Sequence, residues 1–400
     1  MPSDSSLDKA QTLAENLKGN WNYPTQMIFG PGRIKNLGQA CKTLGMTRPL
    51  LITDPGLAGL PMVKDVLAAN EAEGLPTGLF SAVKPNPVGK NVDEGVAAYK
   101  AGGHDGVIAF GGGSGLDCAK AVALMVGQSR PLWDFEDKGD NWKRVDPDGI
   151  APIVAVPTTA GTGSEVGRAS VIVDEATHTK KIIFHPKMLP STVISDPELT
   201  VGLPPHITAA TGMDALAHCL EAYCAPGYHP MAEGIAVEGM RLVKEWLPKA
   251  VTDGKDLAAR AHMLAAASMG ATAFQKGLGA IHSLSHPVGA LYDTHHGLTN
   301  AVFMPYVLAF NRPAIEDRMV RLAAWLGLKN PSFNAVQDWI LALREELKIP
   351  AKLDGLGVDG ARIDEIAEMA AEDPTAPTNP LPVGAPEMRK MFEMALEGRL

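Results

Sequence analysis

The chain has 400 residues, of which 46% are hydrophobic and 20% charged, and its formal net charge is −9. A chain of this length exceeds what one hydrophobic core usually supports, so two domains are expected. A mildly acidic chain without a block of lysine and arginine is a poor candidate for binding nucleic acid or an anionic membrane surface. No apolar run is long enough to span a bilayer.

The first twenty residues are polar and include acidic side chains, which fits neither a secretory signal nor a transit peptide. We expect residues 1–20 to form a mobile or helical extension. The four cysteines, Cys41, Cys118, Cys219 and Cys224, form no C-x-x-C pair and have apolar neighbours. Buried free thiols in a reducing cytoplasm are therefore the expectation.

The first half of the chain alternates short β-rich runs with helical segments. The predicted strands are 26–29, 50–53, 79–82, 106–110, 153–157 and 170–173, and the predicted helices are 33–44, 62–72, 92–101 and 116–125. This alternation predicts a parallel sheet with helices on both faces. Such sheets bind ligands at the carboxyl ends of their strands.

After about residue 200, strand-like runs disappear and helical segments follow one another. The predicted helices are 209–225, 231–251, 257–274, 314–326, 333–347, 363–372 and, after a proline-rich loop at 374–386, 387–398. We therefore predict an α/β domain over residues 1–202 and an all-helical domain over residues 203–400, with the boundary near 201–205.

A glycine-rich run, GGGSG at 111–115, follows a predicted strand and opens a predicted helix. Glycines allow a backbone to approach a ligand closely, and the N–H groups at a helix start favour a pyrophosphate. The run does not match G-x-G-x-x-G, because Leu116 stands where the last glycine is required. An ordinary strand-to-helix turn is the alternative, but it would seldom need four glycines in five residues.

Two further segments fit a bound dinucleotide. Asp54 in LLITDPG follows a predicted strand, where its carboxylate would accept hydrogen bonds from a ribose diol and repel a 2′-phosphate, favouring NAD over NADP. The alternative role for Asp54 is a turn or helix cap before Pro55. The hydroxyls and glycines of VPTTAGTGSE at 156–165 follow another strand and suit phosphate and ribose contacts.

A carboxylate and a group of histidines predict a metal site in the helical half. Asp214 and His218 are four residues apart on a predicted helix, so both side chains project from one face. Four histidines follow within fifteen residues: His282, His286, His295 and His296. A single histidine on an apolar helix is usually a core residue, but this grouping favours a metal. Spacing alone leaves the third and fourth ligands open among these four.

At these residues the chain resembles the iron-containing (group III) alcohol dehydrogenases. The resemblance covers nearly the whole chain and rests on FGPGR at 29–33, GGGSxxDxAK at 111–120, PTTAGTGSE at 157–165, GMDALAH at 212–218, and GLGAIHSLSHPVGA through HHGLTNA at 277–301. It implies the architecture shared with dehydroquinate synthases: a dinucleotide-binding α/β domain, a helical domain, and an active site between them.

The resemblance also implies roles for individual residues. The metal ligands would be Asp214, His218, His282 and His296. His286 would act beside the nicotinamide and substrate without binding the metal, and His295 would have no part in the site. The implied cofactor contacts are Asp54, Asn86, Gly112, Gly113, Ser114, Asp117, Thr158, Thr159, Ser164 and, with one gap in the match, Lys181.

The implied activity is hydride transfer between NAD and a small primary alcohol or ω-hydroxy acid, in a homodimer or larger oligomer. The family's usual ion is Fe(II), and the ligand set would also accept Zn(II). A divalent cation stabilises negative charge on an alcohol oxygen, as this chemistry requires. The alternatives are a metallohydrolase, another metal- and NAD-using enzyme of the glycerol dehydrogenase-like superfamily, or a non-enzymatic nucleotide-binding protein. The complete Asp-His-His-His set favours the alcohol dehydrogenases.

One segment departs from the family pattern. Residues 273–279 read AFQKGLG, apparently shifted by one from relatives that carry a Phe-Ser-Asn type stretch there. This segment is expected to line the substrate pocket, so the substrate does not transfer from the family. Lys276 within it suggests an anionic substrate.

Overall fold

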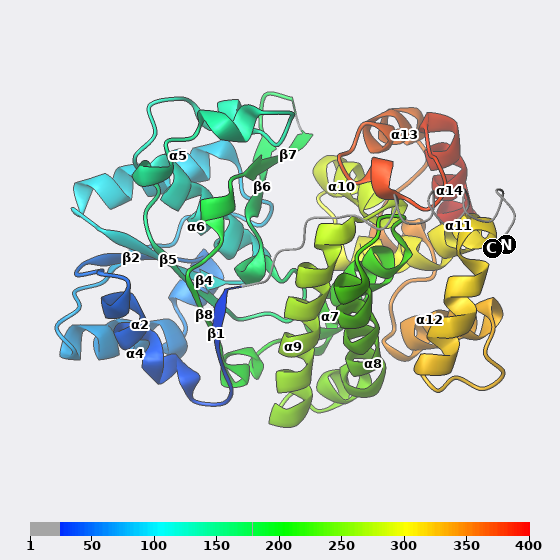
Figure 1. Cartoon of the computed structure of the whole chain (residues 1–400), viewed down its shortest axis with the longest axis horizontal. Helices are drawn as coiled ribbons and strands as arrows, with labels where there is room; N and C mark the ends of the chain where they lie inside the picture. The colour runs from blue at the N-terminus through cyan, green and yellow to red at the C-terminus, as the bar shows by residue number, and fades with distance from the viewer. Residues whose placement is uncertain (1–24, 178) are drawn as a thin grey trace, which may run out of the picture.

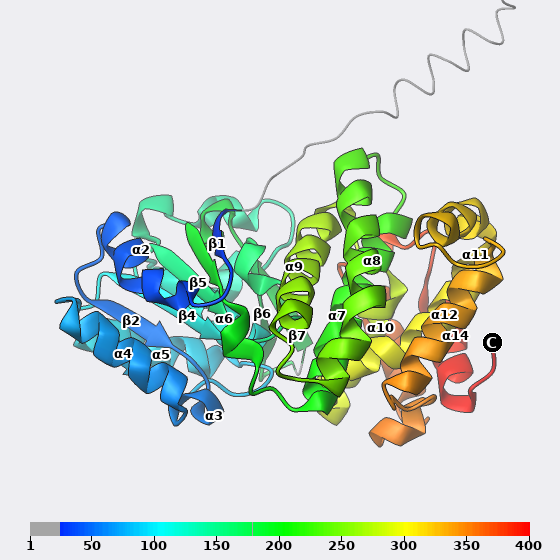
Figure 2. The same cartoon turned by 90° about the horizontal axis from the view of Figure 1, so that it is seen from below.

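The computed structural model describes residues 25–177 and 179–400, so the predicted extension at 1–20 lies outside the described residues. A sheet with flanking helices forms one side of the molecule, and a bundle of helices forms the other (Figures 1 and 2). Among the described residues, no helix combines the length and apolar character needed to cross a membrane.

Six parallel strands form the main sheet, in the order β1-β8-β5-β4-β2-β3. They are β1 (Gln26–Phe29), β2 (Pro49–Ile52), β3 (Gly78–Phe80), β4 (Gly106–Gly111), β5 (Ile153–Pro157) and β8 (Thr192–Ser195). The helices between them are α2 (Leu37–Thr43), α3 (Pro55–Ala58), α4 (Pro61–Ala72), α5 (Gly89–Ala101) and α6 (Gly113–Met125). The parallel sheet with flanking helices is therefore confirmed.

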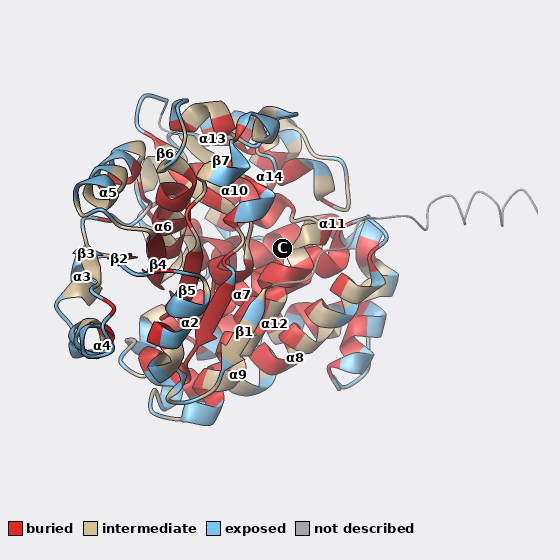
Figure 3. Ribbon diagram, turned by 60° about the vertical axis from the view of Figure 1, so that its left-hand side comes forward, coloured by how far each residue is buried: buried red, intermediate tan, exposed pale blue. Residues whose placement is uncertain are grey.

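Alternate residues of the central strands pack into two separate apolar cores. Leu51 and Ile108 share a core with α2 and α4, whereas Leu50, Val107 and Ile153 share one with α5 and α6. Successive side chains of a strand point to opposite faces, which explains this division. Each fully buried aliphatic side chain contributes about 1.5–3 kcal/mol. Figure 3 shows buried residues, in red, along the central strands β4 and β5 and on helices such as α6.

The order of the strands places a ligand-binding crevice between β2 and β4. The chain leaves β2 toward β3 on one side and leaves β4 toward β5 on the other. Ligands of open parallel sheets bind where connections diverge in this way, at the carboxyl ends of the strands. Asp54 lies two residues after the end of β2, and Gly111 ends β4.

The predicted strand at 170–173 exists but does not belong to the parallel sheet. It is β6 (Ala169–Asp174), which pairs antiparallel with β7 (Thr179–Phe184), a strand that the sequence analysis missed. Parallel neighbours need a crossover of a dozen or more residues, and only four residues separate these two strands. A hairpin is the arrangement that this connection allows.

From residue 205 onward, the described chain contains helices and no strand. They are α7 (Pro205–Cys224), α8 (Pro230–Thr252), α9 (Leu257–Ala273), α10 (Ala280–Tyr292), α11 (His296–Trp325), α12 (Phe333–Glu346), α13 (Ile363–Ala371) and α14 (Ala385–Glu397). Their buried side chains form a third apolar core. The helical C-terminal region agrees with the prediction.

All four cysteines are free and buried, as predicted. Burial raises the pKa of each thiol, Cys41, Cys118, Cys219 and Cys224, to about 12. Such thiols stay protonated and unreactive near neutral pH. Their role is packing.

Candidate metal and nucleotide site

A pocket with a cavity volume of about 260 Å³ lies between the two halves, and we call it the cleft pocket. Its walls come from the start of α6, the β6–β7 hairpin, α7, α10 and the start of α11. Residues more than 150 positions apart in the sequence therefore meet here. The site must be built by both halves together.

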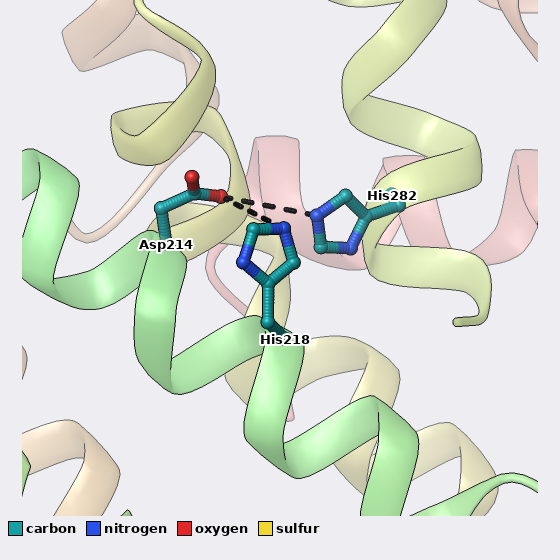
Figure 4. A group of neighbouring side chains, drawn as sticks. All are labelled: Asp214, His218 and His282. Carbon is teal, nitrogen blue, oxygen red and sulfur yellow. Dashed lines mark ion pairs between the residues drawn. The ribbon is translucent and has the colours of Figure 1, made fainter. Parts of the chain in front are cut away.

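Asp214, His218 and His282 form a group of candidate metal ligands at the inner end of this pocket. The first two lie on α7 and the third on α10, and Figure 4 shows the two imidazoles turned toward the carboxylate. Oδ1 of Asp214 is 3.8 Å from Nε2 of His218 and 3.8 Å from Nε2 of His282. Nε2 of His296, the first residue of α11, lies 3.6 Å from the same oxygen.

These separations match what a tetrahedral metal requires. Ligand atoms about 2.1 Å from a metal at tetrahedral angles are roughly 3.4 Å apart. The three observed distances from Asp214 Oδ1, 3.6 to 3.8 Å, lie just above that value. His296 is the outermost of the four, because it does not belong to the group whose ligand atoms all lie within 4.8 Å of one another.

The charges around the group also fit a divalent cation. Asp214 and Glu221 are 2% and 6% exposed. Within the described part of the chain, their only ion pairs within 4 Å are with histidines. Two buried carboxylates without a lysine or arginine partner are costly. A doubly charged cation would balance them.

The pKa values of the candidate ligand histidines shift in different directions. Burial lowers the pKa of His218 to about 4, and burial together with Lys180 lowers that of His296 well below its usual range. Both are therefore neutral near pH 7, as a metal ligand must be. Burial also opposes the charged form of His282, but Glu221 outweighs it and raises the pKa of that imidazole.

Asn300 is a residue of this site that the sequence analysis missed. It follows His296 by one turn of α11 and is fully buried. Its Nδ2 donates to Asp214 Oδ1 at 2.8 Å and lies 3.2 Å from Nε2 of both His282 and His296. The spacing of four residues in HGLTN was the available signal, since such residues share a helix face.

His286 lines the same pocket, one turn after His282 on α10. Its Nδ1 is 2.7 Å from Oδ2 of Asp373, another residue missed from the sequence. Burial opposes the charged form of Asp373, but His286 and Thr375 outweigh it and lower the pKa of the carboxyl group. His295 is exposed and precedes the first residue of α11.

The glycine-rich run forms an open helix start beside the pocket. Gly112 precedes α6, no side chain caps that helix, and Gly111 has a φ of 145°. A Cβ on Gly113 would stand 2.5 Å from Cγ2 of Thr162. Gly113 therefore packs too closely against the Thr162 side chain to carry a side chain of its own, and the uncapped N–H groups of the first turn suit a phosphate.

The predicted cofactor residues divide into two sets. Asn86, Gly113, Ser114, Asp117 and Ser164 line the cleft pocket. Asp54, Gly112, Thr158 and Thr159 lie outside its walls, where β2, β4 and β5 end. Because these three strands are neighbours in the sheet, the second set lies along one edge. One set therefore lies at the carboxyl edge of the sheet, and the other lines the pocket that also contains the candidate metal ligands.

Two of the predicted contacts have roles within the protein. Oδ1 of Asp54 accepts a hydrogen bond from the N–H of Leu57 at 3.0 Å and caps α3, which was the alternative role. Asp117 accepts from Ser164 Oγ at 2.5 Å and from the N–H of Val171 at 3.0 Å. Asp117 therefore ties α6 to the loop after β5 and to the hairpin.

Lys181 does not reach the cleft pocket, whereas Lys180 lines it. Lys181 Nζ pairs with Asp174 Oδ2 at 2.7 Å and lies 5.2 Å from the ring centre of Trp133. The two lysines are consecutive in β7, so they point to opposite faces of the hairpin.

The segment that departs from the family pattern, AFQKGLG at 273–279, contributes Phe274 and Leu278 to the pocket wall, as predicted. Phe274 contacts His218 edge-on, with ring centres 5.1 Å apart. Lys276 lies elsewhere: its Nζ pairs with Glu233 Oε1 at 2.8 Å and donates to the carbonyl of Tyr223 at 3.2 Å. Lys276 is therefore already paired outside the pocket wall and gives no support to an anionic substrate.

Comparison with known proteins agrees with this geometry. Residues 24–197 match the family model described as iron-containing alcohol dehydrogenase, and residues 208–396 match the C-terminal model of the Fe-containing alcohol dehydrogenase family. The chain is 38% identical over 385 residues to a 4-hydroxybutyrate dehydrogenase of Cupriavidus necator, covering 94% of this chain and 99% of that one. It is 36% identical over 384 residues to an NAD-dependent methanol dehydrogenase of Bacillus methanolicus, covering 94% and 100%.

Solved structures show the same architecture. A 1,3-propanediol oxidoreductase matches with a TM-score of 0.89 at 33% identity, over 95% of this chain and 100% of that one. A sulfoacetaldehyde reductase of Bifidobacterium kashiwanohense in complex with NAD+ matches with a TM-score of 0.85 at 27% identity, over 94% and 99%. The chain therefore belongs to the iron-containing alcohol dehydrogenase family, and it is an NAD-dependent alcohol dehydrogenase of the kind that uses iron or another divalent metal.

Proposed function

We propose that the protein transfers a hydride between NAD and a small primary alcohol or ω-hydroxy acid at a metal held by Asp214, His218, His282 and His296. The observation that carries this proposal is the position of three imidazole nitrogens 3.6 to 3.8 Å from one buried carboxylate oxygen, in the pocket that the start of α6 also lines. The bound cation, Fe(II) or Zn(II), supplies Lewis acidity toward the alcohol oxygen.

The N-terminal half would bind and orient the nucleotide. The open first turn of α6 suits the pyrophosphate, and the carboxylate of Asp54 suits the ribose diol. Lys180 replaces Lys181 in this proposal, because Lys180 is the lysine that lines the pocket. We accordingly assign residues 1–202 to the nucleotide-binding part and residues 203–400 to the metal-binding part.

His286 would exchange the proton of the alcohol. Asp373 lies at its Nδ1, which leaves Nε2 as the ring nitrogen available to the substrate. A neighbouring carboxylate stabilises the imidazolium that forms when this nitrogen accepts a proton. Proton transfer at a positioned histidine typically contributes a factor of about 10² to 10⁴.

The pocket favours a short substrate with an apolar chain. Val171, Val173, Ile182, Phe274 and Leu278 supply apolar wall, and Lys180 supplies a cation. The similar proteins named for methanol, 1,3-propanediol and 4-hydroxybutyrate support small primary alcohols and ω-hydroxy acids as the substrate class. We further propose a cytoplasmic homodimer or larger oligomer, which light scattering of the purified protein tests.

Metal analysis joined to an NAD-linked substrate panel tests the proposal. The purified protein should contain about one iron or zinc per chain and should reduce NAD with short primary alcohols. Removal of the metal with a chelator should abolish this activity, and Fe(II) or Zn(II) should restore it. Activity that survives complete metal removal would overturn the metal assignment.

A further inference from the structure

Glu221 lies on the same helix face as Asp214 and His218, seven and three residues after them on α7. Its side chain is buried, and both of its oxygens reach across to α10. Oε1 accepts a hydrogen bond from the N–H of Ile281 at 2.8 Å, and Oε2 lies 2.5 Å from Nδ1 of His282. One helix thus supplies two candidate ligands and the partner of a third.

We propose that Glu221 is a positioning residue for the metal, which keeps the lone pair of His282 Nε2 directed at the ion. The inference rests on the metal site proposed above and goes beyond it, because Glu221 is neither in the group of candidate ligands nor among the residues that line the cleft pocket.

The chemistry of the two groups determines the tautomer. A carboxylate can only accept hydrogen bonds, so the hydrogen of a neutral imidazole facing it must be on Nδ1. The lone pair is then on Nε2, the atom 3.8 Å from Asp214 Oδ1. Metal-binding histidines are commonly held by such a carboxylate, which also makes the ring a better donor to the metal.

His282 is the only one of the three candidate ligand imidazoles with this support in the described structure. In the described structure no carboxylate pairs with Nδ1 of His218, and Nδ1 of His296 has a contact of 3.5 Å with Ser285 Oγ. His282 also comes from a different helix than Asp214. Its orientation therefore depends on a link between α7 and α10, and Glu221 is that link.

The second oxygen of Glu221 stabilises the start of α10. Gly279 precedes this helix and offers no side chain to its free N–H groups. A carboxylate is favoured at a helix start because the N–H groups there carry partial positive charge. Removing the whole side chain would disturb the helix as well as the ligand, so the test must preserve the acceptor.

Glu221→Gln separates the two roles. The amide oxygen still accepts from Ile281, but the amide nitrogen now donates to His282 Nδ1, which moves the ring hydrogen onto Nε2 and into the metal site. We expect the Zn(II) affinity, measured by competition with a chromophoric chelator, to fall by about 10- to 100-fold. The melting temperature of the metal-free variant should stay near that of the metal-free wild type.

Asp373→Asn is the matched control. It alters the equivalent carboxylate–Nδ1 pair one turn along α10, at His286, which is outside the ligand set. Its Zn(II) affinity should stay within about twofold of the wild type. Equal Zn(II) affinity in Glu221→Gln and wild type, or an equal loss in both variants, overturns the positioning role. Failure of the wild type itself to bind Zn(II) overturns the metal site instead.

A measurement on the unaltered chain covers the case in which Glu221→Gln does not fold. Nitrogen chemical shifts of ¹⁵N-histidine-labelled, metal-free wild type report the tautomer of each ring, and His282→Ala assigns the signal. The spectra are recorded at a pH at which the His282 ring is neutral. A neutral ring with its hydrogen on Nδ1 supports the proposal, and a neutral ring with its hydrogen on Nε2 refutes it.

Discussion

Nδ2 of Asn86 donates a hydrogen bond of 3.1 Å to Oδ1 of Asp293, joining residues 207 positions apart. Asn86 precedes α5 in the sheet half and lines the cleft pocket, whereas Asp293 directly follows α10. Both have left-handed backbones, with φ of 49° and 51°. Two non-glycine residues with this uncommon backbone conformation thus meet across the junction of the two halves.

Replacing Asp293 with glycine should loosen this junction without straining the chain. Glycine accepts the left-handed φ, so Asp293→Gly removes mainly the hydrogen bond, worth about 0.5–1.5 kcal/mol. We expect KM for NAD to rise about two- to tenfold, with kcat changed less. Asn86→Gly should have at least this effect, because Asn86 is also a predicted cofactor contact, and the double variant should add little to Asn86→Gly. An unchanged KM in both single variants contradicts a role for this contact.

His282→Ala tests the metal site by loss of a ligand. We expect the metal content to fall below about a tenth of the wild-type value and kcat to fall by about a thousandfold or more, because the cation supplies several kcal/mol to the reaction. The neighbouring control is His295→Ala, an exposed residue outside the ligand group, which should retain both. Wild-type turnover in His282→Ala would show that the ligand assignment is wrong.

Asp54→Ser tests the choice between NAD and NADP. Serine can keep the cap on Leu57 but carries no charge to repel a 2′-phosphate. We expect the ratio of kcat/KM for NAD to that for NADP to fall by about tenfold, equivalent to about 1.4 kcal/mol. Asp54→Asn should behave similarly. If the ratio stays constant in both variants, Asp54 serves only as the cap.

Lys180 predicts a pH dependence of nucleotide binding. Burial lowers the pKa of this amine to about 8, although nearby carboxylates such as Asp117 and Asp214 favour its charged form. The positive charge that would attract the nucleotide phosphates is present below that pH and is lost above it. KM for NAD should therefore rise between pH 8 and 10 in the wild type.

Lys180→Arg supplies the check, since arginine stays charged throughout this range. Its KM for NAD should vary less with pH than that of the wild type, and Lys180→Met should show a high KM at every pH. Lys181→Met should leave the pH profile as it is, because Lys181 pairs with Asp174 outside the pocket. Identical profiles for Lys180→Arg and wild type would exclude Lys180 as the group that titrates.

Much of the sheet was predictable because its strands are short apolar runs separated by helical segments. β8 was missed, since its four residues lie between proline-containing segments that resemble a loop. α10 and the first half of α11 were missed because Pro287, Pro305 and Pro313 lie inside them. Proline usually ends a helix, but in α10 and α11 tertiary packing keeps the helix intact across the prolines.

The site was predictable where neighbours in sequence share a face and unpredictable where helices meet. Asp214 and His218 follow from their spacing alone. The pairing of Glu221 with His282 spans 61 residues, and that of His286 with Asp373 spans 87. Such contacts depend on how α7, α10 and the segment after α13 pack, which no local pattern records.

The β6–β7 hairpin, which forms part of the wall of the cleft pocket, lines the pocket with one set of residues and packs into the core with another. Val171, Val173 and Ile182 face the pocket, whereas Ile172 and Ile183 are fully buried in the core beneath. Mutations at the first three positions would reshape the space around the substrate and spare the packing that holds the hairpin in place. The range of accepted substrates can therefore change, in evolution or by engineering, with little loss of folding stability.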